Sequence, residues 1–239
     1  MKRFLLVPLV VASLAVPALA DAKDDVKAAA KKVGDAPAYT WTTTTEIEGS
    51  QWTPATITGK ALKGGPSVIT SEREGQVTTA VVQGEKGAVK TDEGWKTAEE
   101  LRNAAGGGGG GGGRGGRGAM LLRTRPPADE AARIADKTKE LKASDGVVSG
   151  DLTEEGAKEL ATLGRGRPGG QAPEARNAKG SVKYWIKDGQ LSKMQLKVSA
   201  TLSVNGEDRD MARTTTYEIK DVGATTVTVP DEAKKALGL

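Results

Sequence analysis

Among the adjacent acidic pairs of the sequence, three are considered as a catalytic acid and base: Glu99/Glu100, Asp129/Glu130 and Glu154/Glu155. Two carboxylates supply the acid and the base of glycoside hydrolysis, but only where they face each other across a cleft. Each pair here lies at the predicted start of a helix, where the helix dipole favours negative charge. We therefore predict that these carboxylates stabilise helix ends and that the chain is not an enzyme.

The residue types that most often bind metals or act as nucleophiles are missing. The sequence contains no Cys and no His, which excludes thiol and histidine catalysis and argues against a zinc or copper site. A Ser/Lys pair and a calcium site stay open, although Asp208–Asp210 follows a predicted hairpin turn and is interpreted as a solvated edge. We predict no catalytic residue, no metal and no cofactor.

A glycine run at residues 106–113 continues into two arginines, Arg114 and Arg117. It lacks the Gly-Lys-Ser/Thr ending of a phosphate-binding loop. It is similar to RGG segments, which bind single-stranded nucleic acid through charge and arginine stacking, but it has no interleaved aromatic residue. We predict a flexible Gly/Arg-rich loop over residues 104–118, a second Gly/Pro/Arg-rich loop over 164–180, and no nucleic-acid partner.

Residues 1–20 predict a cleavable secretory signal. Lys2 and Arg3 precede an apolar stretch, and Ala18-Leu19-Ala20 supplies the small residues that a signal peptidase recognises. Because Pro8 and Pro17 interrupt the stretch, it is too short to span a bilayer, which takes about 20 residues. We predict cleavage after Ala20, a periplasmic or secreted protein, and no transmembrane segment once the signal is removed. The leader holds two basic residues and no acidic ones, so its loss takes the formal net charge from +4 to +2.

Hydrophobic periodicity divides residues 21–239 into helices and strands of a single α+β domain. Apolar residues with a 3.6-residue period predict helices at Asp24–Gly34, Ala128–Lys142 and Thr153–Leu163, with a last short helix after Pro230. Two-residue alternation separated by short turns predicts an antiparallel sheet. The predicted strands are Trp41–Ile47, Ala55–Ala61, Ser67–Arg73, Gln76–Gln83, Gly87–Thr91, Val147–Leu152, Val182–Ile186, Lys193–Val204, Met211–Lys220 and Thr225–Val229.

One face of the predicted sheet is apolar, and this face is the candidate ligand-binding surface. The clearest alternation sets apolar residues against Lys, Gln, Ser and Thr between residues 193 and 204. Such a face either lines a cavity for a hydrophobic ligand or packs on helices as an ordinary core, and both interpretations remain open. The cavity candidates are Trp41, Ile57, Met194, Leu196, Val198 and Leu202.

Three segments are similar to the periplasmic lipoprotein-carrier superfamily, the LolA-like and LppX/LprG-like proteins. Val26–Val33 with Tyr39–Ile47 resembles its opening helix and first strand. Tyr184–Leu191, followed by Lys193 and Leu196, resembles its central hairpin. Tyr217–Gly223 with Val227–Pro230 resembles its closing strands.

This resemblance implies a curved antiparallel sheet, a half-barrel, with helices covering its concave face and with residues 97–163 as the lid region. It also implies an exported soluble carrier of a hydrophobic ligand, which is either a lipid or a lipid-modified protein. The alternative is a non-enzymatic sensing or protein-interaction module of the same fold, with a protein partner. The ligand, the partner and the oligomeric state stay open at this point.

Overall fold

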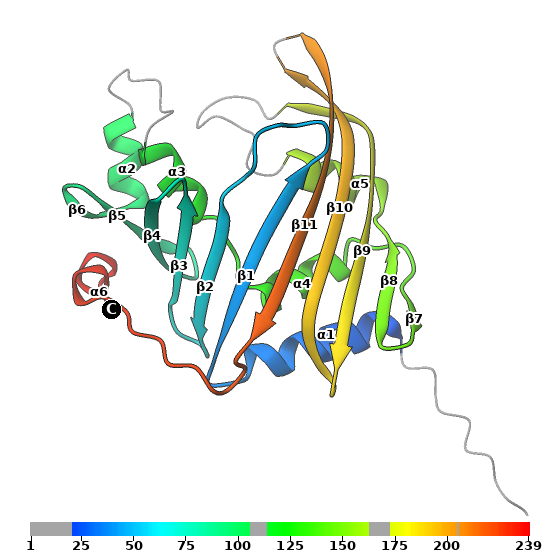
Figure 1. Cartoon of the computed structure of the whole chain (residues 1–239), viewed down its shortest axis with the longest axis horizontal. Helices are drawn as coiled ribbons and strands as arrows, with labels where there is room; N and C mark the ends of the chain where they lie inside the picture. Colours follow the sequence, from blue (N-terminus) through cyan, green and yellow to red (C-terminus); the bar gives the residue numbers. More distant parts are fainter. Residues whose placement is uncertain (1–20, 106–113, 163–172, 205) are drawn as a thin grey trace, which may run out of the picture.

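The computed structural model describes residues 21–105, 114–162, 173–204 and 206–239, so the predicted signal at residues 1–20 lies outside it. The described residues form one open sheet of eleven strands in the order β6-β5-β4-β3-β2-β1-β11-β10-β9-β8-β7 (Figure 1). All neighbouring strands run antiparallel. The predicted α+β fold with a large antiparallel sheet is confirmed.

The elements follow one another along the chain in two series of strands with helices between them. The strands are β1 (Ala38–Ile47), β2 (Thr56–Leu62), β3 (Ser67–Arg73), β4 (Gln76–Gln83), β5 (Lys86–Thr91), β6 (Gly94–Thr97), β7 (Lys142–Ser144), β8 (Val147–Asp151), β9 (Glu174–Lys187), β10 (Gln190–Val204) and β11 (Glu207–Lys220). The helices are α1 (Ala22–Gly34), α2 (Ala98–Ala105), α3 (Arg114–Leu121), α4 (Pro127–Ala135), α5 (Glu154–Thr162) and α6 (Asp231–Leu237).

The first and last strands meet in the middle of the sheet. β1 pairs with β11 over eight residues, from Thr40 opposite Lys220 to Ile47 opposite Arg213. The meander β1–β6 therefore extends to one side of this pair, and β10 to β7 extend to the other (Figure 1). Strands from the two ends of the described chain thus pair at the centre of the open sheet, at β1 and β11.

Helix α1 forms as the sequence predicts. The Asp21 carboxylate accepts a hydrogen bond from the backbone N–H of Lys23, and Lys31 and Lys32 lie in the last turn, where the helix dipole favours positive charge. Its apolar stripe is buried against the sheet and consists of Val26, Ala29, Ala30 and Val33. The helix is thereby fixed across β9 and β10.

The helices cover the sheet on the face that we call the inner face. α1 and α5 pack on β9 and β10, α4 packs on α1 and β10, and α2 and α3 lie behind β3 to β6 (Figure 1). Buried residues of these helices and of the inner face form one hydrophobic core. The predicted helical cover over one face of the sheet is thus confirmed.

The C-terminal segment corrects one predicted strand. Residues 225–229 were predicted as a closing strand, but they are in extended coil without strand pairing. They cross to the opposite face of the sheet, which we call the outer face, and end in α6. Val229, Ala233 and Leu237 pack there on Val81 and Ala88. The alternation of Val227 and Val229 reflects their packing on the outer face of the sheet and not pairing with an edge strand.

Three further boundaries differ from the predictions. The loop predicted over residues 104–118 is shorter, because 104–105 end α2 and 114–118 begin α3, while 106–113 lie outside the described residues. The loop predicted over 164–180 is also shorter: β9 begins at Glu174 because its long pairing with β10, broken by a bulge, continues to Ser203. Helix α4 ends at Ala135, although 128–142 was predicted to be helical.

Candidate functional site

The inner face of β1 combines aromatic and hydroxyl side chains. Because side chains alternate along a strand, Trp41, Thr43 and Thr45 point to the same face. Trp41 is 2% exposed and Thr43 is 7% exposed, whereas Thr45 is half-buried. Across the sheet, Thr43 lies opposite Ile57 of β2 and Tyr217 of β11.

A band of half-buried side chains continues from β1 onto both neighbouring strands. Ile57, Tyr217, Thr45 and Thr215 all remain partly accessible, although they belong to the helix-covered face. The Oγ1 atoms of Thr45 and Thr215 lie 3.4 Å apart. We call this band, together with the two buried residues beside it, the inner strip, and its members are Trp41, Thr43, Thr45, Ile57, Thr215 and Tyr217.

The helices pack mainly on either side of the inner strip. On one side α1 and α5 contact β9 and β10, and on the other α2 and α3 contact β3 to β6. Met194, on β10, is fully buried, and so is Ile69 on β3. Ile57 and Tyr217 of the inner strip pack against this single core but stay partly accessible.

The structure divides the six predicted cavity residues into two groups. Met194, Leu196, Val198 and Leu202 alternate along the inner face of β10 and are at most 4% exposed. They share one core with residues of α1 and α5. Trp41 belongs to the same core and Ile57 packs against it, and these two residues lie together at the inner strip, on the paired strands β1 and β2.

Two buried polar atoms of the inner strip have no hydrogen-bond partner among the described residues: Trp41 Nε1 and Thr43 Oγ1. A buried donor or acceptor left unsatisfied destabilises a fold by about 1–3 kcal/mol. Most such groups in folded proteins bind protein atoms or ordered water. These two atoms therefore mark the part of the inner face that differs most from an ordinary dry core.

A glycine creates the space for the Trp41 indole. A Cβ atom on Gly59 would lie 2.0 Å from Cζ2 and 2.3 Å from Cε2 of Trp41. The indole ring therefore rests directly on the β2 backbone, and its centroid is 5.8 Å from that of Tyr39. The sequence Thr56-Ile57-Thr58-Gly59 thus fixes the orientation of Trp41.

An ion-pair cluster on α4 and α5 contributes charge to the interior. The Arg133 guanidinium donates two hydrogen bonds to the buried Glu130 carboxylate, at 3.0 Å and 2.7 Å, and one to Glu159 at 2.9 Å. Lys137 also pairs with Glu159, and these two cations hold the pKa of Glu159 below its usual range, chiefly through the Lys137 hydrogen bond. We call Glu130, Arg133, Lys137 and Glu159 the α4–α5 cluster; it joins the two helices.

The charges of this cluster reach the inner strip. Burial raises the pKa of the Tyr217 phenol, and the negative charge of Glu130 raises it further, while Arg213 and Arg133 act in the opposite direction. Burial likewise raises the pKa of Tyr184, whose hydroxyl lies 3.4 Å from the Ala131 carbonyl oxygen of α4. The Tyr217 phenol therefore stays protonated, with burial as the main cause.

Arg213 connects β11 to α5. Its side chain lies on the inner face, opposite Ile47 on one side and Val198 on the other. It donates a hydrogen bond to the backbone carbonyl oxygen of Leu160, near the end of α5. Beyond Thr215, the hydrogen bond from Arg213 to Leu160 therefore joins β11 to α5.

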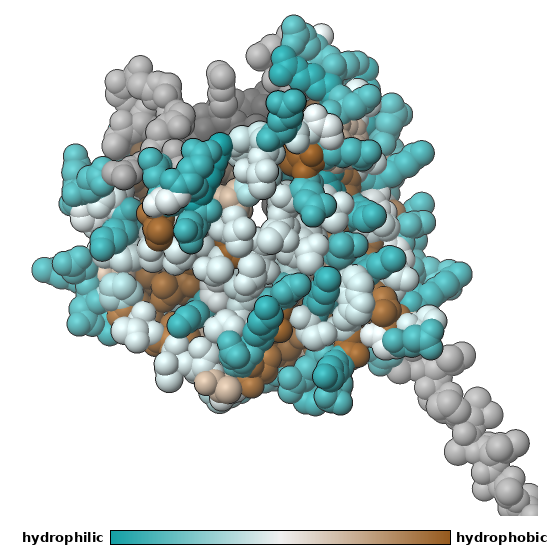
Figure 2. Space-filling model, viewed as in Figure 1, coloured by the Kyte–Doolittle hydropathy of each residue, from teal (hydrophilic) through white to brown (hydrophobic). Residues whose placement is uncertain are grey.

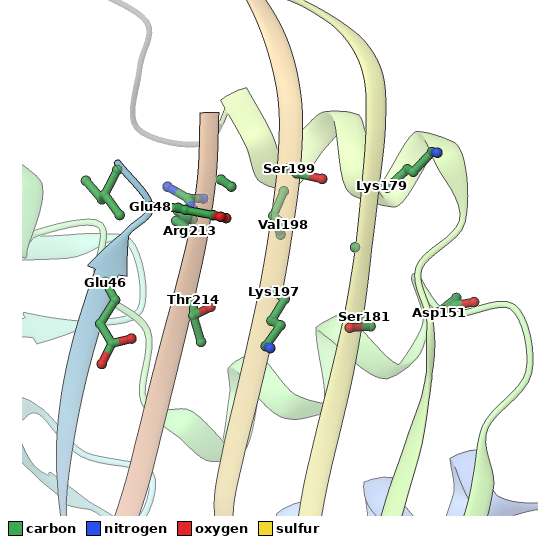
Figure 3. Close-up of a pocket in the computed structure, with 13 residues that line it drawn as sticks. Glu46, Glu48, Asp151, Lys179, Ser181, Lys197, Val198, Ser199, Arg213 and Thr214 are labelled. Carbon is green, nitrogen blue, oxygen red and sulfur yellow. The ribbon is translucent and has the colours of Figure 1, made fainter. Parts of the chain in front are cut away.

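A separate, polar hollow lies on the outer face. It has a volume of about 660 Å³, and Figure 3 shows Thr214, Lys197 and Ser181 side by side across β11, β10 and β9. Acidic and basic residues line it, and the charged members are Glu46, Glu48, Asp151, Lys179, Lys197 and Arg213. A second hollow of about 460 Å³ adjoins it toward Asp210.

Away from the apolar contact with α6, the middle of the outer face is polar. Figure 2 shows a pale central area on this face, bordered by hydrophilic side chains. Threonines of four paired strands lie in register there: Thr42, Thr58, Thr70 and Thr79. The contrast between this face and the apolar inner face is what the alternating sequence predicts.

Sequence reasoning missed the polar members of the inner strip. Thr43, Thr215 and Tyr217 were assigned to strands but not to a site, and Arg213 was not singled out. The available signal was the alternation itself, since Thr43 and Thr45 share the face of Trp41. Among the described residues, no group of three or more acidic side chains is placed to hold a metal ion. No helix in the described ranges is long and apolar enough to cross a membrane.

No family model matches the chain, and no curated protein matches it in sequence. Solved structures are similar in fold. LprF from Mycobacterium bovis has a TM-score of 0.45 and 14% identity, covering 89% of this chain and 97% of LprF. The lipoprotein LppX from Mycobacterium tuberculosis has a TM-score of 0.42 and 9% identity, covering 86% of this chain and 97% of LppX.

A LolA superfamily protein from Nitrosomonas europaea has a TM-score of 0.34 and 12% identity, covering 89% of this chain and 96% of that protein. At sequence identities this low, structural similarity says nothing of what this chain binds.

Proposed function

We propose that this chain is an exported, non-enzymatic carrier of an amphiphilic ligand, a lipid or a lipid-modified protein, which it holds over the inner strip. The observation that carries the proposal is the pair of buried, unpartnered atoms, Trp41 Nε1 and Thr43 Oγ1, beside half-buried side chains. A core built only for stability would place apolar side chains at such positions. A ligand over the strip would both cover Ile57 and satisfy these atoms.

Apolar surface beside the strip supports the same proposal. Burying each methylene of an acyl chain contributes about 0.8 kcal/mol, and Ile57 and the Tyr217 ring offer accessible apolar area. Met194, Leu196, Val198 and Leu202 are packed against helices, so in this proposal they form the wall of the site and not its lining. Trp41 and Ile57 are the two predicted residues that would touch the ligand.

Filling the inner strip should abolish binding. Replacing Ile57 by Trp is expected to weaken binding of a fluorescent fatty-acyl probe at least tenfold, because the larger ring would occupy the ligand's place. The matched control is Thr58→Trp, on the same strand but on the exposed outer face. Both variants are measured by fluorescence titration after circular dichroism has verified their folding. Equal affinity in wild type and Ile57→Trp would rule out the strip as the binding site.

The outer hollow favours the second candidate, a sensing or protein-interaction module. Its charged rim resembles the polar composition of non-obligate interfaces more than that of a ligand pocket. Under the carrier proposal, Lys197→Glu should leave lipid binding unchanged, because Lys197 lies on the opposite face from the strip. The control is Lys183→Glu, which is exposed on the outer face of β9 and does not line the hollow.

The same two variants test the alternative in a pull-down from the envelope fraction. A partner that wild type and Lys183→Glu both retain, and that Lys197→Glu loses, would favour the interaction module. Identical capture by all three proteins is the result expected for a carrier whose outer face has no specific role.

A further inference from the structure

The polar groups of the inner strip indicate which part of a ligand they would bind. Trp41 Nε1 carries a hydrogen that it can only donate, and Thr43 Oγ1 can donate or accept. The two residues are separated by one position on β1, so they lie on one face about 7 Å apart along the strand. Both are more than nine-tenths buried and unpartnered among the described residues. Together they require at least one hydrogen-bond acceptor.

The third polar group lies directly across the strand pair. Tyr217 is the Cα partner of Thr43, and its half-buried side chain carries a hydroxyl that can donate or accept a hydrogen bond. Side chains opposite each other on one face have Cβ atoms about 5 Å apart. The hydroxyl and indole groups of the strip thus line one short segment of β1 and β11.

The two arginines near this segment already have hydrogen-bond partners. Glu130 is paired with Arg133 at 2.7 Å, and Arg213 donates to the Leu160 carbonyl oxygen. A buried carboxylate or phosphate from a ligand would need a cation that is not engaged elsewhere. An uncharged acceptor, such as the carbonyl oxygen of an ester or amide, needs only the donors that the strip provides.

We propose that Trp41, Thr43 and Tyr217 form a polar binding site for the uncharged carbonyl group of an acyl ester or amide. This inference rests on the proposed carrier function and adds to it the chemical class that the site selects. Trp41 donates to the carbonyl oxygen, and Thr43 and Tyr217 complete its hydrogen bonds. An ester lipid therefore binds more tightly than a hydrocarbon or an ionised fatty acid with a chain of equal length.

The test compares three ligands with delipidated full-length mature protein. Monoolein, oleate and 1-octadecene are titrated against a bound fluorescent acyl probe, in wild type and in Thr43→Val. Valine keeps the shape of threonine and removes the hydroxyl. We expect wild type to prefer monoolein over both other ligands, and Thr43→Val to lose about fivefold to tenfold in monoolein affinity. Its affinity for 1-octadecene is expected to stay unchanged.

A stability measurement in the absence of ligand gives an independent readout. Thr43→Val should raise the melting temperature of the lipid-free protein, because an unsatisfied buried hydroxyl is removed. Thr42→Val is the matched control, since Thr42 neighbours Thr43 but points to the outer face. It should change neither the melting temperature nor the ligand affinities.

Each outcome separates the two proposals. If the probe and all three lipids fail to bind wild type, the carrier function is wrong. If lipids bind but wild type does not prefer monoolein, or Thr43→Val keeps full monoolein affinity, the carbonyl site is wrong while carriage stands. A higher melting temperature with unchanged monoolein affinity would show that the hydroxyl is unsatisfied in the lipid-free protein but takes no part in ligand binding, which also overturns the carbonyl site.

Discussion

Replacing Arg133 by Met is expected to lower the free energy of unfolding by about 3 kcal/mol. Glu130 is 7% exposed, and Arg133 donates both hydrogen bonds that its carboxylate receives from a side chain. Removing the guanidinium leaves a buried carboxylate without its cation, and this effect exceeds the value of the ion pair itself. Urea denaturation followed by circular dichroism measures the change.

A double variant separates the charge effect from lost packing. Arg133→Met combined with Glu130→Leu should recover most of the lost stability, because no unpaired charge remains in the interior. The comparison pair is Lys158–Glu154, whose side chains are 46% and 73% exposed. Lys158→Met should produce no measurable change, since exposed pairs are screened by solvent. If Arg133→Met unfolds at the same urea concentration as wild type, the burial of the Glu130 carboxylate does not depend on the Arg133 guanidinium.

Replacing Gly59 by Ala is expected to destabilise the fold by about 3 kcal/mol. The added Cβ would lie within 2.3 Å of three ring atoms of Trp41, which is far inside van der Waals contact. Because the neighbouring atoms belong to a buried aromatic ring, they cannot move aside as the end of an exposed side chain could. The same denaturation experiment measures the change, with the exposed neighbour Lys60→Ala as the control, expected within about 0.5 kcal/mol of wild type.

A mutant cycle identifies the cause of that loss. If the indole is responsible, Gly59→Ala should destabilise a Trp41→Leu background much less than it destabilises wild type. Equal effects in the two backgrounds would show that the glycine is needed for a reason other than the Trp41 ring. The cycle also tests the position of Trp41, and hence the geometry of the inner strip.

Much of the fold could be predicted from local patterns. Alternation and turns located nearly all strands, and the stripe of Val26, Ala29, Ala30 and Val33 located α1. The errors occur where an extended or helical pattern has a long-range cause. Val227 and Val229 alternate because they rest on Val81 and Ala88 across the sheet, and no local signal distinguishes that from strand pairing.

The site was only half predictable, for a related reason. Apolar alternation identifies which residues of β10 face inward, but it does not show which of them the helices cover. Met194 and Trp41 look alike in sequence, whereas only Trp41 lies at the inner strip. Thr43 becomes notable only when burial and the lack of a partner are known together. Those properties depend on tertiary packing across β1, β2 and β11.

The mass of the protein purified under non-denaturing conditions tests the central claim most directly. Native mass spectrometry of the exported chain should show a mass excess that is lost under denaturing conditions, with the released species identified as an acyl lipid or a lipid-modified peptide. A single species with the mass of the chain alone, unchanged when acyl lipids are added in excess, would contradict the claim that the inner strip holds an amphiphile.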